Sequence, residues 1–106
     1  MIHNSDIEAA ILELQDEIHQ VARDHGFWDS ENAGEKIALM HSELSEALEA
    51  LRQDKWAGKG GVAEELADTI IRILDFAAFH RINLGREIIR KHRYNIIRPY
   101  KHGKKF

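Results

Sequence analysis

The chain is 106 residues long, 43% hydrophobic and 31% charged, with no cysteine and a formal net charge of −3. These values predict one folded domain and exclude disulfides, thiolate metal sites and cysteine nucleophiles. No apolar run is long enough to cross a bilayer or to act as a secretory signal, so we expect a cytoplasmic protein without a membrane partner.

The first predicted helix has sequence signals at both ends. Ser5 and Glu8 form a capping-box pattern, in which each side chain can bond to a free backbone N–H at the helix start. Apolar residues then recur at spacings of three and four, as on a helix with one buried face, until Gly26 ends the helix. A loop that contains Trp28 follows.

The second and third helices are expected to form an antiparallel pair. Asn32 is expected to cap the second helix, whose apolar stripe continues to Leu51. Residues 54–61 include three glycines and predict a loop, after which the third helix begins near Val62. Because this loop is short, the two helices should pack side by side.

The fourth helix follows residues 83–85 and ends before Pro99, because a residue that precedes proline is disfavoured in helical geometry. No useful length of chain alternates with period two. The predicted fold is therefore all-α, a short four-helix bundle-like protomer in one domain that spans residues 1–106.

Charge is divided unevenly along the chain. Residues 86–106 hold eight of the fifteen Lys and Arg residues and one acid, a local charge of +7, and the remainder carries −10. The end of the chain from about residue 98 is a basic tail. This division favours a polyanionic partner, or it is a solvated pattern whose halves neutralise each other.

Two pairs of acids repeat the same spacing on the two central helices: Glu43 with Glu46, and Glu65 with Asp68. Residues at i and i+3 are neighbours on a helix, with Cβ atoms about 5–6 Å apart. If the antiparallel helices turn these edges toward each other, four carboxylates converge and require a counterion. Oxygen ligands in that number suit Mg²⁺, or Mn²⁺, better than Zn²⁺.

The alternative interpretation of each pair is a solvated helix face. Leu39 and Ala50 share the sector of the first pair, and Phe76 and Phe79 lie near the second, so these faces are not simply polar. Like charges at this spacing also destabilise a helix slightly, which favours a compensating ligand.

Several other kinds of site lack their signatures. No histidine has a glutamate three residues before it, as a di-iron bundle site requires, and no two of the seven histidines stand three or four apart, which weakens a zinc site. The sequence contains neither a complete phosphate-binding P-loop nor a Gly-x-Ser-x-Gly nucleophile motif. Any hydrolysis would therefore use water.

Cationic and aromatic residues elsewhere are candidates for contacts with a nucleotide. Trp28 and Trp56 lie in predicted loops, where they either stack on a base or cap the ends of the helical core. The side chains that can reach phosphate oxygens are Lys55, Lys59, Lys91, Arg93 and Arg98.

Taken in order, these residues resemble the MazG-like all-α nucleoside triphosphate pyrophosphohydrolases. The similarity covers about residues 31–103 and comprises Glu43-x-x-Glu46, the Lys55-Trp56 loop, the acidic run at 64–68 and Lys91-x-x-x-Asn95-x-x-Arg98-Pro99. It implies Mg²⁺-dependent cleavage of (deoxy)nucleoside triphosphates between the α- and β-phosphates, in nucleotide-pool sanitation. The products would be a nucleoside monophosphate and pyrophosphate.

The resemblance also implies roles for individual residues. Glu49 would orient water or hold a second metal, and the protein would be a homodimer or homotetramer with pockets at subunit contacts. The implied metal ligands are Glu43, Glu46, Glu65 and Asp68, and the implied phosphate contacts are Lys91, Asn95 and Arg98.

Two alternatives stay open at this point. The same fold can be specialised to one nucleotide, such as dCTP, dUTP or a phosphoribosyl nucleotide. The chain can also be a non-catalytic helical adaptor whose basic tail binds nucleic acid. Few aromatic residues are interleaved with the bases of the tail and no nucleic-acid-binding motif is present, so nucleic acid is not the expected partner.

Overall fold

The computed structural model describes residues 3–105. They form four helices, α1 (Asn4–Asp24), α2 (Ala33–Arg52), α3 (Val62–Phe79) and α4 (Leu84–Ile97), and a short 3₁₀ turn at Tyr100–Gly103. This range contains no β-strand, which confirms the predicted all-α class. None of the helices described is long and apolar enough to cross a membrane.

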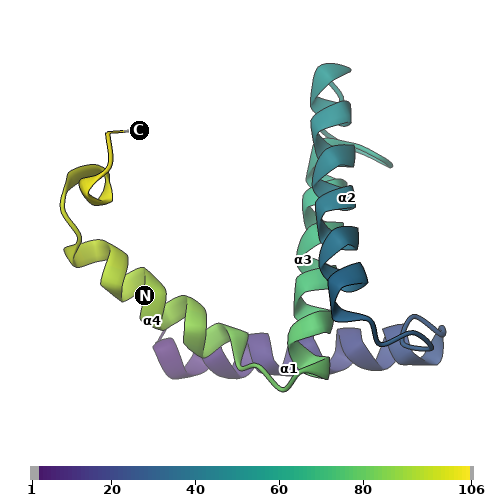
Figure 1. The fold of residues 1–106 in the computed structure, drawn as a ribbon, viewed down its shortest axis with the longest axis horizontal. Helices are drawn as coiled ribbons and strands as arrows, with labels where there is room; N and C mark the ends of the chain where they lie inside the picture. The colour runs from purple at the N-terminus through teal and green to yellow at the C-terminus, as the bar shows by residue number, and fades with distance from the viewer. Residues whose placement is uncertain (1–2, 106) are drawn as a thin grey trace.

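The α2–α3 hairpin stands across α1 (Figure 1), with its two helices antiparallel and side by side as predicted. α1 packs against α3 and also against α4, which leaves the junction in another direction. The radius of gyration is 16.1 Å, whereas a compact domain of about 100 residues has one of about 13 Å. The larger value reflects two arms, the hairpin and α4, that extend separately from α1.

The bundle expected from the sequence is therefore not what one chain forms, because α4 packs on α1 instead of on the hairpin. Gly85 permits this close packing: a Cβ there would lie 3.1 Å from Glu8 Cα and 3.2 Å from Ile11 Cβ. A side chain at this position would push the two helices apart by a few tenths of an ångström.

Gln15 fixes the point where α4 leaves the rest of the fold. Its side chain is 1% exposed. Nε2 donates to the backbone oxygen of Ile82 at 2.9 Å, and Oε1 accepts from the backbone N–H of Leu84 at 3.2 Å. One buried amide on α1 thus satisfies two backbone groups of the α3–α4 connection.

Most predicted helix ends are confirmed. Asn32 Oδ1 accepts from the backbone N–H of Glu35 at 3.0 Å and caps α2. Gly26, at φ +80°, follows α1, and the C-terminal end of α4 falls just before Pro99. These ends depend on local backbone chemistry, which the sequence carries directly.

The predicted cap at Ser5 is wrong. α1 begins at Asn4, so Ser5 lies inside the helix. Glu8, the other member of the expected capping box, accepts instead from Asn83 Nδ2 at 2.8 Å and from Arg86 Nε at 3.3 Å. The contact of Glu8 with the start of α4 therefore takes the place of the predicted hydrogen bond to the start of its own helix.

The core consists mainly of small residues. Its buried apolar side chains are Ala22, Ala47, Ala50, Val62, Leu74 and Ala77. Larger apolar side chains of the hairpin remain 45–56% exposed: Leu44, Leu48, Leu51, Leu66 and Ile70. The alanines allow close approach of the helices, and the hairpin leaves an apolar surface in water.

Candidate active site

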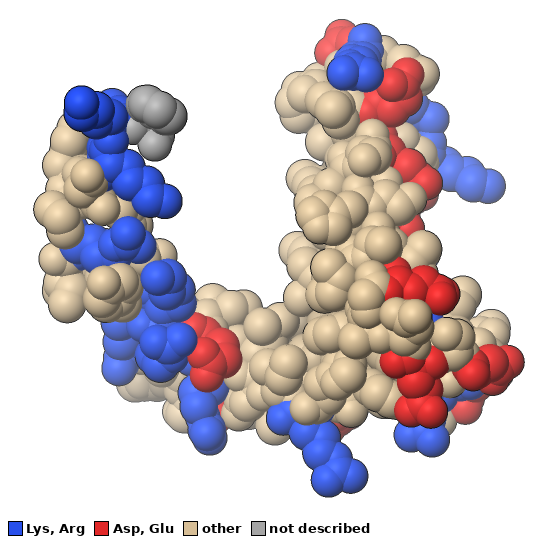
Figure 2. Space-filling view, viewed as in Figure 1, with Lys and Arg blue, Asp and Glu red and all other residues tan. Residues whose placement is uncertain are grey.

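Carboxylates of α2 and α3 converge on the hairpin, where Figure 2 shows acidic side chains along one edge. Oxygens of Glu43, Glu46 and Glu65 lie within 4.8 Å of one another, and so do oxygens of Glu64, Glu65 and Asp68. Glu65 belongs to both groups. The i, i+3 spacing thus places Glu65 of α3 beside both acids of the α2 pair, and Asp68 beside Glu65 and Glu64. These two overlapping groups of five residues are called the acidic cluster below.

Glu65 is the buried centre of the acidic cluster, at 8% exposure. Its Oε2 has no hydrogen-bond partner among the residues described. Burial, followed by contacts with the carboxylates of Glu46 and Glu43, raises the pKa of Glu65 from 4.5 to about 7. A buried oxygen without a donor, beside further carboxylates, fits a hard divalent cation such as Mg²⁺ or Mn²⁺.

Glu43 has a cationic partner. Arg72 Nε donates to Glu43 Oε1 at 2.9 Å, and the Glu43 side chain is 12% exposed. Arg72 lies four residues after Asp68, which places it one helical turn along the same face of α3.

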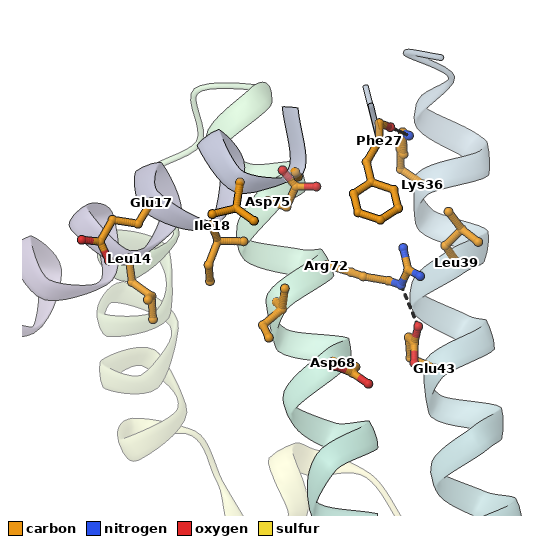
Figure 3. A pocket seen from close by; sticks show the side chains of 13 residues that line it. Leu14, Glu17, Ile18, Phe27, Lys36, Leu39, Glu43, Asp68, Arg72 and Asp75 are labelled. Carbon is orange, nitrogen blue, oxygen red and sulfur yellow. Dashed lines mark hydrogen bonds and ion pairs between the residues drawn. The ribbon is translucent and has the colours of Figure 1, made fainter. Parts of the chain in front are cut away.

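A pocket of about 610 Å³ adjoins the acidic cluster between α1, α2 and α3 (Figure 3). This volume lies within the range of about 300–1,000 Å³ found for small-molecule sites. The pocket has an apolar part and a charged part. The apolar side chains are Leu14, Ile18, Val21, Ala22, Phe27, Leu39 and Ile71, and the charged ones are Glu17, Lys36, Glu43, Asp68, Arg72 and Asp75.

Three charged residues of the pocket were not predicted from the sequence: Lys36, Arg72 and Asp75. A signal was present, because Arg72 and Asp75 follow Asp68 at spacings of four and seven, and Lys36 precedes Glu43 by seven. Such spacings keep residues on one helix face. On a surface helix the same spacings also produce rows of alternating charge that face solvent. The pattern alone therefore did not distinguish residues that line a pocket from residues of an exposed helix face.

Trp28 packs into the contact between α1 and α3. Its ring stacks on Phe79 at a centroid distance of 3.9 Å, and Lys36 Nζ lies 4.7 Å from the ring centre. Its Nε1 donates to both oxygens of Asp75, at 2.9 and 3.0 Å, and the same carboxylate lies 2.8 Å from His19 Nδ1. Trp28 is thus held by contacts within the fold, with Phe79 and Asp75 of α3 and with Lys36 of α2.

The glycine-rich loop between α2 and α3 is open to solvent. Trp56 is 59% exposed and its Nε1 donates to Asp54 Oδ1 at 2.9 Å. Lys55 and Lys59 are exposed in the same loop. None of these three side chains lines the pocket beside the acidic cluster.

Glu49 lies one helical turn beyond Glu46 but belongs to neither group of close carboxylates. Its Oε2 lies 3.7 Å from Arg52 Nη1, and both side chains are largely exposed. Glu49 is therefore at the margin of the acidic cluster rather than within it.

The phosphate contacts implied by the resemblance, together with Arg93, lie on the other arm. Lys91 and Asn95 line a shallow pocket of about 460 Å³ on α4. Arg98 Nη1 donates to Asn95 Oδ1 at 3.4 Å, and Arg93 is exposed on the same helix. Figure 2 shows the basic side chains of this arm apart from the acidic edge of the hairpin, so one chain does not bring the two sets together.

The fold and this site define a small all-helical domain with an acidic cluster beside a pocket. No protein-family model matches the chain, and no curated protein or solved structure is significantly similar to it.

Proposed function

We propose that the protein hydrolyses (deoxy)nucleoside triphosphates at the α–β phosphoanhydride, with Mg²⁺ as cofactor, and thereby acts in nucleotide-pool sanitation in the cytoplasm. The observation that carries the proposal is the acidic cluster around Glu65, whose Oε2 has no hydrogen-bond partner within residues 3–105, next to a pocket with cationic side chains. Phosphoryl transfer uses carboxylates that hold a divalent metal ion and positively charged side chains that bind the phosphates.

Glu43, Glu46, Glu65 and Asp68 would hold Mg²⁺, with Mn²⁺ as a substitute. The bound cation would neutralise the triphosphate and polarise its phosphorus–oxygen bonds. Glu46 is exposed, and no Lys or Arg within residues 3–105 forms an ion pair with it. One oxygen of its carboxylate would hold the cation, and the other would take the proton of a water that attacks the α-phosphorus as the bond to the leaving pyrophosphate breaks.

The pocket beside the acidic cluster divides in a way that suits a nucleotide. Its apolar side, which includes Leu14 and Ile18 of α1, would hold the nucleoside. Its charged edge, where Arg72 and Asp68 lie, would face the phosphates. A nucleotide would then extend from the pocket toward the acidic cluster.

We further propose that two copies assemble, as a homodimer or within a homotetramer. The half-exposed leucines and Ile70 of the hairpin form an apolar surface that a second copy would cover. In one chain, Lys91 and Asn95 stand on the arm that packs on α1. They would bind the triphosphate of a partner's acidic cluster, where opposite charges attract.

A product assay tests the reaction. The protein is incubated with a panel of nucleoside and deoxynucleoside triphosphates and Mg²⁺, and pyrophosphate is resolved from orthophosphate. We expect pyrophosphate and the monophosphate in equal amounts. Orthophosphate as the sole product, or no turnover of any triphosphate, would contradict the proposal. A strong preference within the panel would identify the enzyme as specialised to one nucleotide.

Variants connect the activity to the acidic cluster. Glu46→Ala and Asp68→Ala should each lower kcat by about 100-fold or more, the scale of losing one electrostatic contact in an active site. Glu13→Ala removes an exposed carboxylate of α1 and serves as the matched control, with unchanged kcat. Circular dichroism verifies that each variant stays folded. Retained activity in Glu46→Ala and Asp68→Ala would remove this site from the reaction.

A further inference from the structure

Arg72 connects the acidic cluster to the pocket. It lies on α3 with its side chain 35% exposed, and Glu43, its partner on α2, is 12% exposed. A charge pair that is partly withdrawn from water is coupled more strongly than one on an open surface. Glu43 therefore holds the guanidinium in a defined place at the boundary of the pocket (Figure 3).

The contact with Glu43 uses only Nε of Arg72. Within residues 3–105, neither terminal nitrogen has a hydrogen-bond partner. A guanidinium carries five N–H donors, so four are left. In Figure 3 the terminal nitrogens are directed away from Glu43, toward the side of the pocket where Phe27 and Lys36 lie. Free donors in this fork geometry match the oxygens of a phosphate or carboxylate.

The charges around Arg72 favour phosphate that carries its own cation. Asp68 and Asp75 also line the pocket and would repel a bare anion. A polyphosphate that meets a divalent cation at the acidic cluster avoids this repulsion. Its chain can also reach both the cation and Arg72, which a single carboxylate cannot do.

We infer that Arg72 binds a phosphate group of the substrate through its two terminal nitrogens, while Glu43 positions the guanidinium through Nε. The inference rests on the proposed function, because it assigns a residue to the triphosphate of that reaction. It requires no rearrangement of the contact seen here, since a carboxylate has two oxygens and Glu43 can accept from Arg72 on one and offer the other to a metal.

Two calorimetric titrations test the inference on Arg72→Gln. The first uses Mn²⁺ alone, and the second uses inorganic tripolyphosphate in excess Mn²⁺. We expect tripolyphosphate to bind the variant about tenfold more weakly or worse, the effect of losing a charge-assisted hydrogen bond. Mn²⁺ alone should bind more tightly than to the unmodified protein, because the variant no longer places a positive charge beside the carboxylates that hold the metal. A merely structural role would weaken both affinities.

Two further variants sharpen the comparison. Arg23→Gln removes one exposed arginine of α1 that lies outside the pocket. Both of its affinities should stay within about twofold of those of the unmodified protein, well under the tenfold change, about 1.4 kcal/mol, expected for Arg72→Gln. Arg72→Lys keeps the charge but replaces the fork by a single ammonium. Its affinity for tripolyphosphate should therefore fall between those of the unmodified protein and Arg72→Gln.

Three results would overturn the inference: no binding of tripolyphosphate by the unmodified protein, equal affinity in Arg72→Gln, or parallel weakening of Mn²⁺ and tripolyphosphate. The proposed function fails separately. If the two titrations respond in opposite directions but no triphosphate is hydrolysed, Arg72 is a phosphate-binding residue and the proposed reaction is wrong.

Discussion

Glu43 and Glu65 face each other across the contact between α2 and α3, with carboxylate oxygens within 4.8 Å and both side chains largely withdrawn from water. The two acids differ in their surroundings. Glu43 has the guanidinium of Arg72 as a counter-charge, and Glu65 has none among the residues described. Burial and the neighbouring carboxylates of Glu46 and Glu43 raise the pKa of Glu65 to about 7, so Glu65 takes a proton where no cation is bound.

The first prediction concerns the pH dependence of folding without metal. The pKa of Glu65 is about 7 in the folded protein and 4.5 as its ordinary value. Between these values the folded state binds more protons than the unfolded state, so the free energy of unfolding should fall as pH rises from about 4.5 to about 7. Above this window both states are ionised and Glu65 contributes no further change. Urea denaturation in a chelator, repeated across this pH range, measures the effect.

Two variants isolate this titration. Glu65→Gln has no proton to lose and should show a smaller decline than the unmodified protein over the same window. Glu64→Gln changes the exposed neighbour and should retain the full decline. Mg²⁺ added above pH 7 should restore stability to the unmodified protein, because the cation replaces the proton. An identical pH dependence in Glu65→Gln would contradict the assignment.

The second prediction concerns sites shared between copies. Chains with Glu46→Ala and chains with Lys91→Ala should each be inactive alone. If every site combines the acidic cluster of one copy with α4 of another, co-expression leaves one intact site in each mixed dimer. Random mixing then restores about a quarter of the full activity in a symmetric dimer. Light scattering on the same samples reports the mass of the assembly.

A matched pair of variants gives the control for this experiment. Glu46→Ala and Asp68→Ala alter the same acidic cluster, so mixing them leaves no complete cluster and should restore nothing. Recovery in this control, or no recovery in the first mixture, would show that α4 and the acidic cluster of different copies do not share a site.

The third prediction concerns Gln15, whose buried amide satisfies the backbone of Ile82 and Leu84. Gln15→Leu should lower the free energy of unfolding by about 2–6 kcal/mol, because an unpaired buried polar group costs roughly 1–3 kcal/mol and two are created. Chemical denaturation measures the loss. Gln20→Leu changes an exposed glutamine that bonds to Asp24 on its own helix and should cost less than about 0.5 kcal/mol. Equal costs for the two variants would contradict the bridging role of Gln15.

The sequence predicted those features that depend on neighbours along the chain. Asn32 and Gly26 mark helix ends through bonds and backbone angles within a few residues. The acidic cluster could also be predicted from the sequence. Glu43 and Glu65 each begin a pair of acids with the same spacing, and the short loop between the two helices makes them antiparallel. The helix ends required only local capping and turn chemistry, and the acidic cluster required only helix periodicity and the short loop between α2 and α3.

Features that depend on distant pairs were not predicted. Glu8 bonds to Asn83, 75 residues away, and not to the start of its own helix. From the sequence, Gly85 is predicted to be part of a turn. Its close contact with α1 is evident only from the structure. Arg72 has the spacing of a surface charge ladder, and its role as the partner of Glu43 depends on how α2 and α3 face each other.

The position of α1 between the two arms has a further consequence. Its N-terminal half carries α4 at Glu8 and Ile11, and its C-terminal half carries α3 through His19. A helix of 21 residues is about 31 Å long. α1 is thus a rigid spacer that sets the distance between the acidic hairpin and the basic arm. In the proposed assembly, a ligand in contact with the hairpin of one copy and the basic arm of another would meet groups that each α1 already holds in place, so little of its binding free energy would be lost in ordering the chains.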